Sequence, residues 1–500
     1  MGNQGLALRG LAAGGDSPPE CCLYEFNITI ADLFVYDSQK NIPKIFQRDG
    51  FVEKVHSSSA LQDGRIQRMD DPNKNRRQFL TSAGAALTTS LFTGQVRGAN
   101  DRVSAAFIGM GRMGTGNLEY AMRQPNLQVA ALCDVYQPNL DAAMAKAGAK
   151  GQSPRAVHDF REILADKSID IVNISTPDHW HAYMTVEACK AGKDVYVEKP
   201  VCLVVEEGRK MVEAARKYNR VVQAGTMQRS AVHFQQACDI VRRGELGKVA
   251  FVRTWNYGNS PAEGIGNPPD GDPPAGLDWD MWLGPAPMRP FNRNRFGVDP
   301  KEFSRFRWFW DYAGGMMTDW GVHWLDIVQM AFDEAMPRSV SSMGGKLWFT
   351  DNRETPDTLQ VTYEYPGFVA TYENRNSNGQ SMFNKDGGIL FHGNKATMYL
   401  DREGYRVIPE GKGGKAVEVK STSSGNLNHW ANFLECVRTR QRPASDIEKC
   451  FRSTSTCLLG NVALRSQMRL DWDERELTVA QTAARGLLTR EYRAPWKLEV

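Results

Sequence analysis

Apolar and polar positions follow two alternating patterns over residues 103–228. Short, continuous apolar runs have the length of buried strands and lie at 103–108 (VSAAFI), 127–134 (LQVAALCD), 169–176 (IDIVNIST) and 194–197 (DVYV). Stretches with helical spacing separate or follow them, at 117–123, 155–167, 182–191 and 205–218. Buried strands that alternate with helices are typical of a parallel sheet with a helix in each crossover. We therefore predict an α/β domain of the Rossmann type.

The pattern changes at Val249 and becomes rich in strands. Alternating or β-branched runs lie at 249–257, 358–365, 367–375 and 389–400, with turn signals at Pro366-Gly367 and Gly393-Asn394. Such runs predict an α+β domain with a large, mostly antiparallel open sheet. Helical patterns at 428–440 and 446–466 are expected to pack against the first domain. Residues 258–276 are a loop rich in proline and glycine, either beside the site or an insertion.

The length of the chain favours more than one core, because 500 residues exceed what a single hydrophobic core usually supports. We expect five parts: a mis-called or disordered extension (1–68), a signal region (69–99), a dinucleotide-binding domain (100–228), a substrate and oligomerisation domain (229–475) and a tail (476–500). The second domain's sheet would also form the face of a homodimer or homotetramer.

Charge and cysteine content narrow the class of function. The net charge is +3 and no long basic run occurs, so nucleic-acid binding is unsupported. The nine cysteines include no CxxC pair and no spacing typical of a metal site. We therefore expect neither a disulfide framework nor a bound metal.

Residues 75–94 resemble a twin-arginine export signal. Arg76 and Arg77 precede a weakly apolar run rich in alanine and threonine, and small residues follow at Gly98-Ala99. The run is too short and too polar to cross a membrane. Because such signals lie at the N-terminus, we expect translation to start at Met69 and the protein to be exported, to the periplasm, by the twin-arginine machinery. The alternative is the start of an ordinary amphipathic helix.

A glycine-rich turn follows the first apolar run and precedes a helical pattern. The residues of this turn that we expect to bind a dinucleotide are Gly109, Gly111, Arg112, Met113 and Gly114. In a GxGxxG turn the first glycine permits the tight turn, the second lets the backbone approach a pyrophosphate, and the third lets the helix pack closely. Free N–H groups at the helix start favour phosphates. The alternative is a glycine-rich turn without a ligand.

Asp134 ends the second apolar run, about 20 residues after the turn, where a dinucleotide fold requires an acidic residue. Its carboxylate can accept hydrogen bonds from both ribose hydroxyls and would repel a 2′-phosphate. No arginine follows it closely. The expected cofactor is therefore NAD rather than NADP. If the protein is exported it cannot draw on cytosolic NAD, so we expect the cofactor to be tightly bound.

Further candidate residues follow the other apolar runs. Because ligands bind beyond the carboxyl ends of the strands in a doubly wound sheet, these positions face the predicted cofactor site. They are Thr176, Pro177, His181, Lys199 and Gln228.

Four motifs in this order resemble the Gfo/Idh/MocA oxidoreductases, relatives of glucose–fructose oxidoreductase and inositol dehydrogenase. They are GMGRMG (109–114), STPDHWH (175–181), VEKP (197–200) and GTMQR (225–229), and DYAGGMMTDWGVHWLD (311–326) continues the likeness, which covers about residues 102–475. The last segment and the C-terminal part are similar to a bacterial type of C-terminal domain.

The resemblance implies roles for individual residues. Lys199 would be the catalytic lysine, with a cis Lys-Pro bond that directs it into the cleft, and Asp319 and His323 would be an acid/base pair. The loop from Thr176 to His181, together with Glu198 and Gln228, would line the nicotinamide end. Asp326 would either contact the substrate or hold its helix in place.

The chemistry expected at this site is the oxidation of a secondary alcohol. The hydride leaves carbon for the nicotinamide and the proton leaves oxygen, so a lysine whose neutral form is favoured by desolvation can share it and a histidine can pass it on. If residues 319–323 are helical, Asp319 and His323 lie on one side of that helix.

The leading hypothesis is an NAD-dependent oxidoreductase that acts on a hydroxyl of a sugar or cyclic polyol. A second hypothesis is a glycosidase that oxidises its sugar transiently, eliminates the glycoside and reduces again. Relatives that work in this way tend to lack the lysine of the Glu-Lys-Pro motif, so Lys199 favours net oxidation. A third is a non-catalytic sugar-binding protein, against which Lys199, Asp319 and His323 argue.

Overall fold

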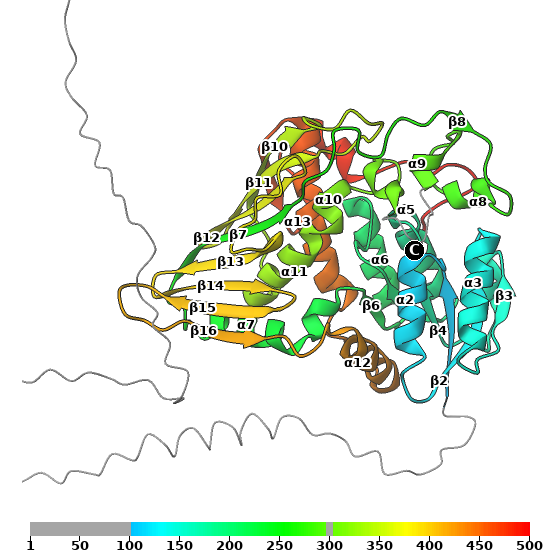
Figure 1. The fold of residues 1–500 in the computed structure, drawn as a ribbon. Helices are drawn as coiled ribbons and strands as arrows, with labels where there is room; N and C mark the ends of the chain where they lie inside the picture. The colour runs from blue at the N-terminus through cyan, green and yellow to red at the C-terminus, as the bar shows by residue number, and fades with distance from the viewer. Residues whose placement is uncertain (1–101, 297–303) are drawn as a thin grey trace, which may run out of the picture. The chain divides into compact units, whose positions relative to one another are not determined.

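The computed structural model describes residues 102–296 and 304–500. The predictions of an extension at 1–68 and of a signal region at 69–99 lie outside these residues. Two sheets dominate the described part, one in each of the two domains that the sequence pattern predicts (Figure 1).

The first sheet has six strands, all parallel, in the order β3-β2-β1-β4-β5-β6. Its strands are β1 (Val103–Ile108), β2 (Leu127–Cys133), β3 (Arg155–Val157), β4 (Ile171–Ile174), β5 (Asp194–Val197) and β6 (Val222–Ala224). The connecting helices are α2 (Arg112–Ala121), α3 (Gln137–Gly148), α4 (Phe160–Ala165), α5 (Asp178–Lys190) and α6 (Val205–Lys217). This is the doubly wound order of a dinucleotide-binding domain, so the predicted Rossmann fold is confirmed.

One helix of the first domain differs from its prediction. Instead of a single helix over 155–167, the chain forms the edge strand β3 and then the short helix α4. The side chain of Asp159 accepts a hydrogen bond from the Arg161 N–H at 2.9 Å, so it caps the helix and sets its start.

The second sheet has ten strands in the order β16-β15-β14-β13-β7-β12-β11-β10-β17-β18. They are β7 (Val249–Tyr257), β10 (Ser339–Gly345), β11 (Thr358–Tyr365), β12 (Phe368–Arg375), β13 (Gly387–Gly393), β14 (Ala396–Asp401), β15 (Gly404–Pro409), β16 (Val417–Lys420), β17 (Leu470–Asp473) and β18 (Thr478–Val479). Within this sheet the β7–β12 pair is parallel and the other described strand pairs are antiparallel, so the predicted large, mostly antiparallel sheet is confirmed.

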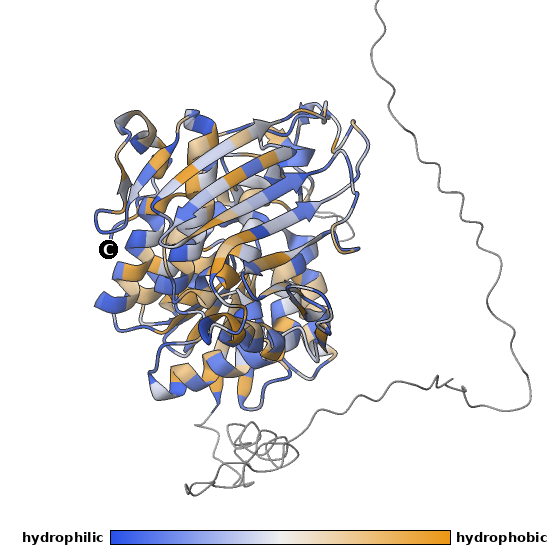
Figure 2. Ribbon diagram, turned by 90° about the vertical axis from the view of Figure 1, so that its left-hand side faces the viewer, coloured by the Kyte–Doolittle hydropathy of each residue, from blue (hydrophilic) through white to orange (hydrophobic). Residues whose placement is uncertain are grey.

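One face of this sheet is covered by helices on the side of the first domain (Figure 1). The other elements of this domain are α7 (Val232–Arg242), α8 (Trp279–Leu283), α9 (Arg293–Phe296), α10 (Gly315–Asp319), α11 (Gly321–Ala331), α12 (Asn426–Thr439), α13 (Ile447–Ser466), the strands β8 (Asp270–Gly271) and β9 (Phe291–Asn292), and the short 3₁₀ turns η2 (Met227–Ser230), η3 (Arg305–Trp308) and η4 (Thr482–Leu488). On the opposite face hydrophilic and apolar positions are mixed along the strands (Figure 2).

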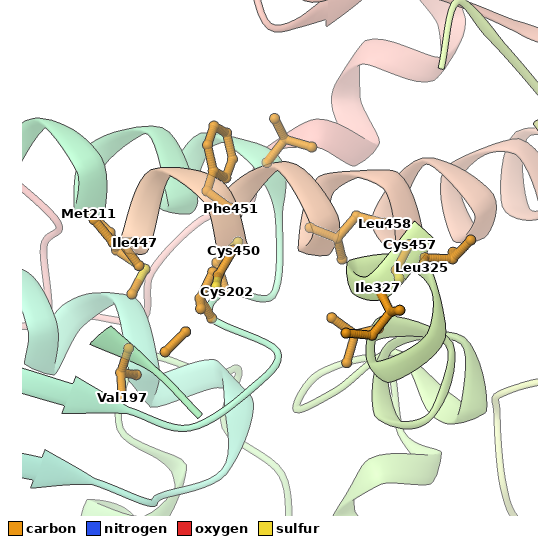
Figure 3. Packing of buried hydrophobic residues seen from close by; sticks show 14 of the residues in the cluster. Val197, Cys202, Met211, Leu325, Ile327, Ile447, Cys450, Phe451, Cys457 and Leu458 are labelled. Carbon is orange, nitrogen blue, oxygen red and sulfur yellow. The ribbon is translucent and has the colours of Figure 1, made fainter. Parts of the chain in front are cut away.

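Helix α13 joins the cores of the two domains. Its Cys450 and Phe451 pack beside Cys202 and Met211 of the first domain, while Cys457 and Leu458 lie beside Leu325 and Ile327 of α11 (Figure 3). The packing against α6 is tight: a Cβ placed on Gly208 would lie 2.1 Å from a ring carbon of Phe451. Helix α12 also covers the first domain, with Trp430 stacked on Tyr196 at 4.6 Å between ring centroids. The predicted packing of both helices against the first domain is thus observed.

Residues 490–496 return to the first domain and pack on α5 and α6. Arg490 forms an ion pair with Glu207 at 2.6 Å and donates a hydrogen bond to the backbone carbonyl of His179. Trp496 packs against Trp180 of α5 with 4.9 Å between ring centroids. Along the described part of the chain, no helix has the length and apolar character needed to cross a membrane.

Candidate active site

A cavity of about 370 Å³ opens beyond the carboxyl ends of the first domain's strands and is closed on its other side by α10, α11 and the turn after β14. Most of the residues predicted for the site line it: Gly109, Gly111, Arg112, Met113, Asp134, Thr176, Pro177, His181, Glu198, Lys199, Asp319 and His323. Gly114 and Gln228 are not among the lining residues. Residues far apart in the sequence therefore form one site.

The glycine-rich turn has the geometry that the motif predicts. Gly109 has a φ of +87°, and a Cβ there would lie 2.8 Å from the backbone of Ser175. A Cβ on Gly114 would lie 1.8 Å from the carbonyl oxygen of Gly109, so α2 packs directly on the turn. At Gly111, by contrast, nothing lies within 4 Å of a Cβ, which leaves open space beside the first turn of α2. A pyrophosphate fits this arrangement.

Asp134 lies at the end of β2 and faces the same cavity. Its carboxylate accepts hydrogen bonds from the N–H groups of Met110 at 2.6 Å and Tyr136 at 2.8 Å. Burial raises its pKa to about 6, although these backbone donors oppose the shift. Hydroxyl donors from a ribose would stabilise the charged form further, so this residue fits the role predicted for it.

Lys199 and Asp319 bring the two domains into direct contact in the cavity. The Lys199–Pro200 bond is cis, as the resemblance implied. The Lys199 Nζ donates hydrogen bonds to the Asp319 carboxylate at 2.7 Å and to its backbone carbonyl at 2.9 Å. The guanidinium of Arg307 reaches the same carboxylate oxygen at 2.5 Å. Asp319 is therefore held between two cations.

The pKa of Asp319 follows from these contacts. Burial alone would raise it, but the charges of Arg307 and Lys199 lower the pKa of the carboxyl to about 2. The group is then ionised throughout the neutral range. In this arrangement Asp319 orients Lys199 and does not exchange protons near pH 7, which differs from the acid/base role that the resemblance implies.

His323 supplies a neutral imidazole to the cavity. Burial, together with the charges of Arg402 and Lys199, holds its pKa well below the usual value for histidine. Its Nδ1 is buried and has no hydrogen-bond partner within 102–296 and 304–500. Asp319 and His323 do not share one helix, because α10 ends at Asp319 and α11 begins at Gly321. They nevertheless line the same cavity.

The remaining predicted residues support the site or shape it. The ring nitrogens of His181 lie 2.7 Å from the Pro200 carbonyl oxygen and 2.9 Å from that of Thr176, so His181 links the two loops. Glu198 accepts a hydrogen bond from Asn117 at 2.8 Å. Gln228 donates to the backbone carbonyl of His323 at 3.0 Å. Gln228 thus holds the backbone at His323 in place without lining the cavity itself.

Asp326 has a structural role in this fold. It is buried, and both of its carboxylate oxygens accept hydrogen bonds from Arg229 at 2.8 and 2.9 Å. It is not among the residues that line the cavity. Of the two roles open for Asp326, the contacts support the one that holds its helix.

Three charged residues of the site were not singled out by sequence reasoning: Asp178, Arg307 and Arg402. Asp178 begins α5 inside the cavity, and burial raises its pKa to about 7 although Arg307 and Lys199 oppose this. Its place in the segment 175–181 offered a signal. Arg307 belongs to η3 and Arg402 to the turn after β14, and nothing in their local sequence marks them as site residues.

Comparison with known protein families gave two matches. The model described as an oxidoreductase family, NAD-binding Rossmann fold, matches residues 103–226. A second, described as an oxidoreductase family, C-terminal alpha/beta domain, matches residues 254–498. Together they cover both domains of the described fold.

Among curated proteins, a glycosyl hydrolase family 109 protein from Shewanella sp. (strain W3-18-1) is 29% identical over 209 residues. That alignment covers 35% of this chain and 44% of the relative, so the chain spans less than half the length of the curated relatives it matches.

Solved structures share the fold at low sequence identity. The WlbA dehydrogenase from Bordetella pertussis, solved with NADH and UDP-GlcNAcA, has a TM-score of 0.56 and 18% identity over 74% of this chain and 99% of that one. An oxidoreductase domain protein from Kribbella flavida has a TM-score of 0.58 and 17% identity over 74% of this chain and 98% of that one.

Proposed function

The chain belongs to the Gfo/Idh/MocA oxidoreductase family, and we propose that it oxidises a hydroxyl of a sugar or cyclic polyol with NAD as the hydride acceptor. The observation that supports this most is the meeting of Lys199, ionised Asp319 and neutral His323 in one cavity with a dinucleotide-binding turn. A base, a hydrogen-bond donor and a cofactor turn are what the oxidation of an alcohol requires.

Bound NAD would supply the hydride acceptor for this reaction. The backbone of Gly109 and Gly111 and the start of α2 would hold its pyrophosphate, and Asp134 its ribose. The carboxylate of Asp134 favours NAD over NADP, because a 2′-phosphate would lie beside a buried negative charge.

His323 is the proton acceptor in this proposal. Its imidazole is neutral at ordinary pH and the residue lines the cavity, so the ring can accept a hydrogen bond from a substrate hydroxyl. As the hydride leaves the carbon, the hydroxyl proton moves to the imidazole.

Lys199 positions the reacting oxygen and stabilises the negative charge that develops on it. Asp319, which also pairs with Arg307, accepts two hydrogen bonds from the Lys199 Nζ, and this leaves one of the three ammonium protons for the substrate. The roles of base and charge stabiliser thus fall on different residues.

The decisive experiment is a panel of sugars and polyols offered to the NAD-loaded protein, with the absorbance of reduced nicotinamide as the readout. A purified protein that neither carries nor binds NAD would contradict the proposal. The variants Lys199→Met and His323→Asn should lose the signal while they retain the nucleotide.

A second function has a specific observation in its favour, because the curated relatives include glycosyl hydrolase family 109 proteins. In that case the enzyme would oxidise, eliminate and reduce again, so NADH would not accumulate. Release of a chromogenic leaving group from an aryl glycoside without net NADH would favour this function over net oxidation. A protein that binds sugars but shows neither reaction would be a non-catalytic binding protein.

The proposal includes export of the folded protein to the periplasm by the twin-arginine route, with its cofactor already bound. A translation start at Met69 and assembly into a homodimer or homotetramer through the large sheet belong to the same proposal. N-terminal peptide mapping and light scattering test these points, and peptides recovered from residues 1–60 would contradict the start at Met69.

A further inference from the structure

Arg402 presents a fixed guanidinium to the cavity. It follows β14, and its Cζ lies over the ring of Trp320 at 4.5 Å from the ring centroid, which is the range of a cation–π contact. Its Nε donates a hydrogen bond to the Gln228 side chain at 3.0 Å. Gln228 is itself buried and bonded to the backbone of His323 at 3.0 Å. These contacts hold the guanidinium in one orientation beside His323.

No carboxylate within 102–296 and 304–500 forms an ion pair with Arg402. The acidic residues next to it have other partners: Asp401 accepts a hydrogen bond from the Tyr399 hydroxyl at 2.7 Å, and Glu403 pairs with Lys385. The other two cations near the reacting end, Lys199 and Arg307, are both bonded to Asp319. Of these three cations near Asp319 and His323, Arg402 is therefore the one without an ion pair to a carboxylate of the described residues.

Arg402 lies at the end of the cavity where we expect the substrate, and the residues expected to hold the phosphates of the cofactor are in the other domain. Its contacts are with Trp320 and Gln228, and its charge acts on His323, the proposed base. The pyrophosphate and ribose sites, by contrast, are formed by Gly109, Gly111 and Asp134 of the first domain.

We propose that Arg402 binds an anionic group of the substrate, so that the sugar or polyol carries a carboxylate or a phosphate. This inference rests on the proposed function, because it concerns the same site. A guanidinium whose Nε is already bonded keeps its two Nη groups, which can bind two oxygens of one anion in parallel. The contact with Trp320 and the hydrogen bond to Gln228 restrict the side chain before an anion binds, which lowers the entropy cost of binding.

The test is calorimetric binding to the NADH-loaded protein, which cannot oxidise an alcohol, of three probes with the same ring: D-glucose, D-glucuronate and D-glucose 6-phosphate. We expect one of the two anions to bind about tenfold to a hundredfold more tightly than glucose, the range for a hydrogen bond to a charged group. Which anion is preferred separates a carboxylate from a phosphate. The preference should weaken as salt is added.

In the variant Arg402→Gln, the preferred anion and glucose should bind with nearly equal affinity. Arg406→Gln is the matched control, since Arg406 is an exposed arginine on β15 that does not line the cavity. Equal affinities in the unaltered protein, or a preference that survives Arg402→Gln, would overturn the inference.

Binding is measured without turnover, which separates this inference from the proposed function. If the protein oxidises glucose but shows no preference for an anion, the proposed function stands and the anion-binding role of Arg402 is contradicted. If Arg402→Gln abolishes a preference for an anion in a protein that never forms NADH, the anion-binding role stands and the proposed oxidation is contradicted.

Discussion

Lys199 and Asp319 lie 120 residues apart in the sequence, yet the lysine Nζ donates hydrogen bonds to both the carboxylate and the backbone carbonyl of Asp319. One residue follows a strand of the first domain and the other ends a helix of the second. The site therefore exists only when both domains are folded and in contact.

Replacing Lys199 with Met should reduce the rate of NADH formation about 10²–10⁴-fold, the usual range for a lost acid/base or charge-stabilising group. The nucleotide content of the purified variant should not change, because Lys199 is not part of the glycine-rich turn. Stopped-flow absorbance with the best substrate of the panel measures the rate. Lys150→Met, an exposed lysine, is the control, and an active Lys199→Met variant would contradict the mechanism.

Asp319→Asn should destabilise the fold as well as the reaction. Because the folded-state pKa of Asp319 is about 2, below its ordinary 3.8, the ionised carboxylate stabilises the protein above pH 4 and this is lost only as the pH falls towards 2. The variant leaves Lys199 and Arg307 without their counter-charge, at a cost of about 3–5 kcal/mol.

Urea unfolding at pH 7 measures that loss. Asp239→Asn removes a partly exposed pair with Arg242 and should cost less than about 1 kcal/mol. Similar values for the two variants would show that Asp319 does not serve as a buried counter-charge.

The pH dependence of hydride transfer should reflect a histidine that stays neutral. A base must be unprotonated to work, and the pKa of His323 lies well below 6.5, so the single-turnover rate should be flat from pH 6 to 8 and fall only in acid. Arg402→Gln removes one of the charges that lower this pKa, so the fall should move to higher pH. A rise centred near pH 7 that disappears in Asp178→Asn would make Asp178 the base instead.

Asp178→Asn should increase stability above neutral pH. The folded-state pKa of Asp178 is about 7 against an ordinary 3.8, so the folded protein binds this proton more tightly and its unfolding free energy falls as the pH rises from about 4 to 7. The amide removes that slope and should gain on the order of 1–4 kcal/mol at pH 8. Urea unfolding of the nucleotide-free protein at pH 5 and pH 8 checks this, with exposed Asp141→Asn as the control.

Two glycines on α2 provide a matched pair. Gly114→Ala would place a Cβ 1.8 Å from the Gly109 carbonyl, so this variant should lose bound NAD and several kcal/mol of stability, on the order of 2–4 kcal/mol. Gly116→Ala has open space and should gain about 0.5–1 kcal/mol from helix propensity. Thermal unfolding and nucleotide absorbance measure both, and equal behaviour would argue against close packing of α2 on the turn.

Much of the fold could be predicted because its signals are local. The buried runs at 103–108 and 127–134 and the alternation at 358–365 each match a strand of the structure. The predicted helix at 155–167 was wrong at its start, because apolar spacing does not reveal that Arg155–Val157 pairs with β2 as an edge strand.

The site was predicted only as far as its motifs reach. Lys199, Asp319 and His323 belong to recognisable segments, but the pairing of Arg307 with Asp319 arises from packing between distant segments. The low pKa of Asp319 and the neutral state of His323 depend on that packing, and so could not be inferred from residue type. Arg402 has no local signal at all.

Helix α13 and residues 490–496 both pack against the first domain. These two contacts limit how far the cleft between the domains can open. A hinge rotation of one domain away from the other would have to separate Phe451 from Gly208 and Trp496 from Trp180. Such contacts form a cooperative unit that opens rarely. If these contacts restrict opening of the cleft, a bound nucleotide would exchange slowly, and we expect one molecule of cofactor to serve many turnovers.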